Sequence, residues 1–257
     1  MPRRLTAGAA LALAFVAVGC SGQESAGPAD PDRARLLAAL PDDALNRGVY
    51  LFRGDIGEEL SPGSLLAPLI GSLIPEADLV VETGAPPVTL LSGLDEDVDL
   101  PEQMTLVDGV AVIGSDEDIA AVDDGLGGTG KLPDPLSILA ASSAPVGWAG
   151  PLPGCEPGTT TDLAEGTLTV ALSEGSAELT VTGSSAKELE SYVAARLDDE
   201  GPAHSPGKPW RTILTDAQVE LDRDRLVIEA VPEDLPGGLL RQLLDTRGLT
   251  FLRPAAC

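Results

Sequence analysis

The chain has 257 residues, of which 16 are basic and 41 acidic, so its net charge at pH 7 is −25. A surface this acidic repels nucleic acid and anionic lipid headgroups, which excludes nucleic-acid binding and attachment to membranes through basic residues. The length suffices for one large domain or two small ones.

The chain begins with the order of parts typical of a secretory signal. Arg3 and Arg4 precede an uncharged, mostly apolar stretch from Leu5 to Val18. This stretch is shorter than the roughly 20 residues of a transmembrane helix but long enough for a signal peptide. Thr6 follows the arginines and Leu5, so both the general secretory route and the twin-arginine route stay open for export.

The segment Ala17–Cys20 resembles the lipobox of bacterial lipoproteins, and the body is similar to an uncharacterised actinobacterial lipoprotein. The resemblance implies a signal peptide at residues 1–19 and acyl chains, including palmitate, on Cys20. It also implies attachment to the cell membrane on its extracytoplasmic face. The mature chain loses Arg3 and Arg4, which takes its side-chain balance from −25 to −27, so only the lipid would hold it at the bilayer.

Residues 20–31 are small, polar and rich in proline and glycine, and we expect a flexible tether there. With Cys20 lipidated, two cysteines remain, Cys155 and Cys257. Outside the cytoplasm an even number of remaining cysteines predicts disulfide bonding, so we expect these two to pair.

The first half of the body predicts alternating short helices and strands. A helix is expected over Asp32–Leu40, and the run Ser64–Ile74, apolar at nearly every position, is expected to be a short buried helix. Ser115 and Asp118 form a variant of the capping box before a further helix. Strands are expected at Val49–Phe52, Leu79–Glu82, Val88–Leu91 and in the hairpin Met104–Ile113.

The order strand, turn, strand, cap, helix then recurs in the second half. Its members are strands at Thr167–Leu172, Glu178–Thr182, Gln218–Leu221 and Leu226–Ala230, with helices from Ser185 to Leu197 and over Leu235–Asp245, and a last strand at Leu249–Leu252. This recurrence predicts an α+β fold in which antiparallel sheets are built from repeated strand-turn-strand-helix units, with the helices on one face. A stretch rich in proline and glycine, 150–159, separates an N-terminal half, 32–150, from a C-terminal half, 160–257.

Two motifs resemble catalytic or nucleotide-binding sequences but lack their context. Gly125–Lys131 matches the phosphate-binding pattern G-x-x-x-x-G-K, yet Leu132 stands where a magnesium-binding hydroxyl is needed. Ser184–Lys187 matches the S-x-x-K pattern of penicillin-binding enzymes, but the elements S-D-N and K-T-G are absent. His204, the single histidine, has no G-x-S-x-G nucleophile elbow to serve, so a surface position is expected.

The remaining candidates favour structural roles. The carboxylate runs Asp95–Asp99 and Asp116–Asp118 lack the spacing of an EF-hand, and we expect a solvated acidic surface and a helix first turn. Trp148 and Trp210 are expected to pack in the core rather than to line a ligand site. No cofactor, metal or catalytic residue is therefore expected.

Three functions stay open at this point. The first is a membrane-anchored, extracytoplasmic interaction or accessory module without enzymatic activity, and the second is a carrier for a lipid or another apolar ligand. The third, an enzyme, would need clustered carboxylates that converge with Ser184 or His204. The absence of a complete catalytic set favours the first.

Overall fold

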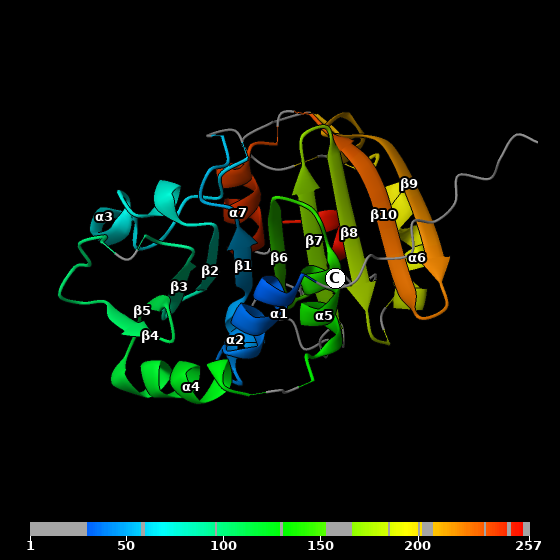
Figure 1. Ribbon diagram of the computed structural model, residues 1–257. Helices are drawn as coiled ribbons and strands as arrows, with labels where there is room; N and C mark the ends of the chain where they lie inside the picture. Colours follow the sequence, from blue (N-terminus) through cyan, green and yellow to red (C-terminus); the bar gives the residue numbers. More distant parts are fainter. Residues whose placement is uncertain are drawn as a thin grey trace, which may run out of the picture.

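The computed structural model describes residues 30–253 except 58–59, 96, 129–130, 153–165, 185, 200, 202–207, 234 and 246–247. One ten-stranded antiparallel sheet runs through the molecule in the order β4-β5-β3-β2-β1-β6-β7-β8-β10-β9 (Figure 1). The strands are β1 (Val49–Phe52), β2 (Leu79–Thr83), β3 (Thr89–Ser92), β4 (Thr105–Val107), β5 (Val110–Ile113), β6 (Val146–Pro151), β7 (Thr167–Ser173), β8 (Ser176–Thr182), β9 (Leu214–Asp222) and β10 (Arg225–Pro232). The α+β class and the antiparallel pairing predicted from the sequence are therefore confirmed.

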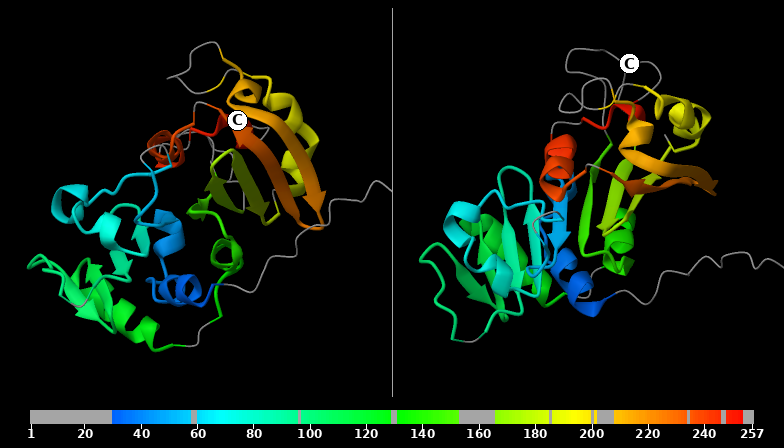
Figure 2. Two further views of the ribbon diagram at one scale, coloured as in Figure 1. Left: turned by 45° about the horizontal axis from the view of Figure 1, so that its top comes forward. Right: turned by 90° about the horizontal axis from the view of Figure 1, so that it is seen from above.

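Helices cover both faces of this sheet, which corrects the expectation that they lie on one. The α-helices are α1 (Pro31–Ala38), α2 (Ala44–Arg47), α3 (Ala67–Ile70), α4 (Asp116–Leu126), α5 (Asp134–Ala141), α6 (Ala186–Arg196) and α7 (Gly237–Asp245), and the 3-10 helices are η1 (Ile74–Glu76), η2 (Trp210–Thr212) and η3 (Thr250–Leu252). In Figure 2, α6 and α7 lie on one side of the sheet and α1 and α5 on the other.

The two faces are explained by the alternation of side chains along the strands. In β1, Tyr50 and Phe52 belong to a hydrophobic cluster that includes residues of α3, α6 and α7. Val49 and Leu51 belong to a second cluster, which includes residues of α1, α4 and α5. Because β1 is buried on both faces, all four of its residues are apolar or aromatic.

Local sequence signals set the ends of several elements as expected. Ser115 caps α4 in a capping box with Asp118, and Asp116, Glu117 and Asp118 occupy its first turn, where the helix dipole favours negative charge. The turn between β4 and β5 is formed by Asp108 and Gly109, both with positive φ, as a two-residue hairpin requires.

Two expected elements are wrong. Only Ala67–Ile70 of the run Ser64–Ile74 is α-helical, and Leu65 and Leu69 are exposed, because only one side of this run, with Ile70 and Leu73, is buried in the core. The expected last strand, Leu249–Leu252, is the 3-10 helix η3, in which Phe251 packs on Trp210 with ring centroids 4.9 Å apart.

The order hairpin then helix is found at β4-β5-α4, β7-β8-α6 and β9-β10-α7. However, Val122 of α4 lies in one cluster, whereas Leu189 of α6 and Leu240 of α7 lie in the cluster on the opposite face. The structure therefore does not show a repeated strand-turn-strand-helix unit.

Strands from both sequence halves share the sheet, since β6 pairs with β7 from Val146↔Leu172 to Pro151↔Thr167. The stretch 153–165 lies outside the described residues, so the boundary between the halves stays a prediction. Among the described residues, no helix combines the length and apolar character that crossing a bilayer demands.

The contact between α1 and α4 generates a stability prediction on two glycines. A Cβ at Gly125 would lie 2.6 Å from the Cα of Ala39, whereas one at Gly127 would meet nothing within 4 Å. We expect Gly125→Ala to lower the free energy of unfolding by roughly 1–3 kcal/mol through overpacking. Gly127→Ala, whose φ is −83°, should be neutral or stabilise by up to about 1 kcal/mol. Urea denaturation of both variants checks this, and equal effects would contradict the packing of α1 on α4.

Candidate functional site

The structure contains a buried ion pair between the sheet and α7. A terminal nitrogen of Arg241, Nη2, donates to Oε1 of Glu82 at 2.5 Å, and both side chains are almost completely buried. Glu82 lies in β2 opposite Tyr50 of β1, which in turn lies opposite Trp148 of β6. The pair therefore lies in the middle of one face of the sheet.

The carboxylate of Glu82 has four hydrogen-bond donors around it. Oε1 accepts from the backbone N–H of Leu65 at 3.0 Å and from Arg241, and Oε2 accepts from the hydroxyls of Ser64 and Thr89. A carboxylate has about four acceptor positions, so Glu82 is saturated by groups of its own chain. Through these four hydrogen bonds the Glu82 carboxylate links β2 to β3, to α7 and to the segment before α3.

The guanidinium of Arg241 makes polar contacts through its nitrogen atoms and a stacking contact through its flat face. Nη1 donates to the carbonyl oxygen of Gly63, and Nε lies 3.6 Å from a carboxylate oxygen of Asp245, one helical turn along α7. The plane of the group lies over the ring of Tyr50, with 4.2 Å from Cζ to the ring centroid, a cation–π arrangement.

Tyr50 completes this network by donating its hydroxyl proton to Asp245 at 2.6 Å. Burial of the phenol, followed by its hydrogen bond to the negative carboxylate, raises the pKa of Tyr50 well above its ordinary value. We call the set Tyr50, Ser64, Glu82, Arg241 and Asp245 the Glu82 clamp.

The Glu82 clamp holds one end of an exposed apolar segment. The sixteen residues Leu60–Pro75, which we call the apolar loop, contain no ionisable side chain. Leu65 and Leu69 in this loop are 46% and 49% exposed, whereas Ile70 and Leu73 are buried in the core. The loop is therefore anchored in the core by some of its apolar side chains and presents others, Leu65 and Leu69 among them, to solvent.

Backbone contacts add to this anchoring at both ends of the apolar loop. A Cβ at Gly237, the first residue of α7, would lie 2.0 Å from the carbonyl oxygen of Leu60. A Cβ at Gly54 would lie 2.0 Å from the carbonyl oxygen of Ile74. No side chain fits at either glycine, so the loop lies directly against the chain at these two positions.

A narrow apolar crevice lies beside the Glu82 clamp, under α7. Its walls include Tyr50, Trp148, Val170, Leu240 and Leu244. The space open to the centre of a water molecule is about 10 Å³, which is room for about one water. The indole N–H of Trp148 is buried without a hydrogen-bond partner in the described part of the chain.

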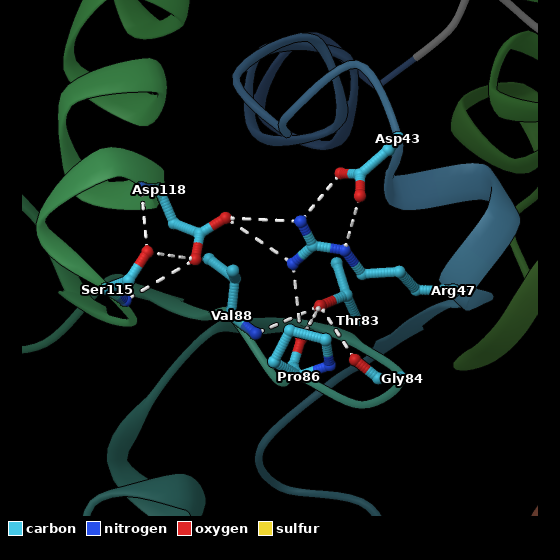
Figure 3. A network of polar contacts seen from close by, with 8 residues as sticks. All are labelled: Asp43, Arg47, Thr83, Gly84, Pro86, Val88, Ser115 and Asp118. Atoms are coloured by element: carbon cyan, nitrogen blue, oxygen red, sulfur yellow. Dashed lines mark hydrogen bonds and ion pairs between the residues drawn. The ribbon is translucent and has the colours of Figure 1, made fainter.

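A second polar network, on the opposite face, joins α2, α4 and the turn between β2 and β3 (Figure 3). Arg47 donates to both carboxylate oxygens of Asp43 at 2.9 and 2.7 Å, to Asp118 at 3.4 Å and to the carbonyl oxygen of Pro86 at 3.2 Å. Asp118 also accepts from the Ser115 hydroxyl at 2.6 Å. The charged groups are paired with one another, so this network supports the fold.

The sequence candidates that fall within the described residues do not converge on one site. Cys20, Cys155, Cys257 and His204 lie outside the described residues. Ser184 follows β8 and Lys187 is exposed in α6, while Gly125 lies inside α4 rather than in a loop that opens a helix. Within the described ranges, no three His, Cys, Asp or Glu side chains gather as metal ligands would.

The expectation for the tryptophans is confirmed, since Trp148 and Trp210 are both buried. Trp210 also donates its indole N–H to the hydroxyl of Thr250 at 3.0 Å. The Glu82 clamp was not anticipated from the sequence. A usable signal was present in Glu82, the only charged residue of the strand Leu79–Thr83, and in Arg241, the only cation among the leucines of α7.

The Glu82 clamp predicts a large cost for removing its cation. Arg241→Met leaves a buried carboxylate without its partner, and we expect the free energy of unfolding to fall by roughly 3–5 kcal/mol. Arg53→Met is the matched control, because Arg53 pairs with Asp55 at 2.6 Å with both side chains more than half exposed. That change should cost less than about 1 kcal/mol. Equal costs in urea denaturation would refute the distinction.

The raised pKa of Tyr50 predicts a loss of stability in alkali. Above about pH 10 the unfolded chain releases this proton while the folded chain keeps it, so stability falls as pH rises further. The slope contributed is at most about 1.4 kcal/mol per pH unit. In Tyr50→Phe this slope should be missing. Urea denaturation between pH 8 and 11.5 measures it, and parallel curves for the two proteins would rule the effect out.

Comparison with known proteins shows no family for this chain. No family model matches it, and no curated protein matches it significantly. Two solved structures are similar over most of its length, "Structure of crystal form I of TP0453" and "Structure of crystal form III of TP0453". Form I has 11% identity and a TM-score of 0.46 and covers 86% of this chain and 98% of that one. Form III has 12% identity and a TM-score of 0.43, with 82% and 97% covered. Likeness at this level carries no argument about function.

Proposed function

We propose that this protein is a lipid-anchored module on the extracytoplasmic face of the cell membrane, attached through Cys20, that works by binding rather than by catalysis. The observation that carries the binding role is the apolar loop, which exposes Leu65 and Leu69 in a strongly acidic protein. The sequence Ala17–Cys20, similar to a lipobox, supports the anchor.

The most buried acidic group of the described chain also favours a binding role. Glu82 is saturated by Ser64, Leu65, Thr89 and Arg241, so none of its acceptor positions is left to take a proton from a substrate. This network therefore favours a structural role for Glu82. A disulfide between Cys155 and Cys257 belongs to the same proposal, since an extracytoplasmic location is oxidising.

The alternative is a carrier for an apolar ligand, and the crevice under α7 is where such a ligand would enter. Its walls are apolar and include the ring of Trp148. The space for about one water is too small for an acyl chain in this conformation. A binding surface on the outside of the protein therefore has the better support.

The anchor is tested by Cys20→Ala in the producing cell. Without the acyl chains, a mature body at −27 has no electrostatic attraction to the bilayer, so nearly all of the protein should leave the membrane fraction. Cys257→Ala is the matched control, because it removes a cysteine that we assign to the disulfide, and it should stay with the membrane. Cell fractionation and immunoblotting measure both. Retention of Cys20→Ala in the membrane would refute the proposal.

A further inference from the structure

The apolar loop differs from the other long uncharged run of the body. Residues 135–154 also lack ionisable side chains, but their described part is mostly buried in α5 and β6, and burial accounts for the absence of charge. In the apolar loop Leu65, Pro68 and Leu69 are exposed. Burial within this chain therefore does not explain why the segment is free of charge.

The exposed leucines are held in place before any partner arrives. Leu65 lies in the turn just before the short helix α3, and Leu69 lies within that helix; both side chains are exposed. The Glu82 clamp holds Gly63, Ser64 and Leu65, and buried Ile70 holds the other side of α3. Such preorganisation lowers the entropic cost of binding, because the surface is already ordered.

Charge and position indicate what covers this surface. The mature body carries −27, so it is repelled by anionic headgroups except where a surface is uncharged and apolar, as the apolar loop is. Only nine residues, 21–29, separate Cys20 from Asp30, where the described chain begins, and a chain of that length spans at most about 35 Å. A body tethered this closely meets the bilayer at a high effective concentration, so that even a weak contact is populated.

We propose that the apolar loop is a bilayer-contact surface, in which Leu65 and Leu69 enter the interfacial layer of the membrane that holds the Cys20 anchor. This inference rests on the proposed function and adds its partner, a phospholipid surface. Contact there gives the body a defined orientation, with α3 toward the lipid.

Tryptophan fluorescence tests the proposal in the lipidated full chain. Trp148 and Trp210 are buried, so Leu69→Trp adds one exposed reporter. Val231→Trp is the matched control, on an exposed position of β10 toward the opposite end of the sheet. Both proteins are reconstituted into phosphatidylcholine vesicles with and without brominated acyl chains. Co-flotation with the vesicles first shows that the anchor holds.

The added emission of Leu69→Trp should fall roughly twofold or more in brominated vesicles, because apolar groups at the interface reach about 5–10 Å below the headgroups. Val231→Trp should be unaffected, and adding Leu65→Asp to Leu69→Trp should remove most of the quenching. Circular dichroism verifies that each variant is folded.

Co-flotation without quenching of Leu69→Trp, or equal quenching of both reporters, would overturn the bilayer contact and leave the anchor intact. Loss of co-flotation would instead tell against the anchor. A second copy of the chain is the competing occupant. Its sign would be a blue shift of Leu69→Trp in the Cys20→Ala chain without vesicles that grows with protein concentration, and this result would also overturn the proposal.

Discussion

The pairing of Glu82 with Arg241 is the interaction on which the site depends. A carboxylate in the middle of an otherwise apolar sheet face is costly unless it is paired and fully hydrogen-bonded. Ser64, Leu65, Thr89 and Arg241 meet this requirement together. The cost of the charge thereby dictates where α7 and the start of the apolar loop lie, since moving either one exposes an acceptor that nothing else fills.

Alternate residues of the central strands face opposite sides of the sheet, and the two sides differ in composition. Tyr50, Glu82 and Trp148 lie side by side on the face that carries the clamp, whereas their neighbours Val49, Val81 and Ala149 lie in a purely apolar core under α1, α4 and α5. Both faces combine packing with polar support, from the Glu82 clamp on one and from Arg47 with Asp43 and Asp118 on the other.

Elements with local signals were predictable from the sequence. The capping box of Ser115 and the Asp108–Gly109 turn are set by a few adjacent residues, and both are found as expected. The sequence analysis expects all helices on one face of the sheet, whereas the structure has them on both. Hydrophobic periodicity shows which side of a helix is buried, but it does not show which face of the sheet that side packs against. The segment Ser64–Ile74 was misjudged for a related reason, since an apolar composition predicts burial and has no separate sign for an exposed binding surface.

The site itself was beyond the sequence, because Glu82 and Arg241 are 159 positions apart and only the fold brings them together. The close approach of Gly237 to Leu60 likewise joins two segments that are far apart in the sequence. The first turn of α7 and the start of the apolar loop touch through their backbones, and Arg241 of α7 also donates to the carbonyl oxygen of Gly63. We therefore expect α7 and the apolar loop to open together, as one locally cooperative unit that joins the surface of the protein to a segment late in its sequence.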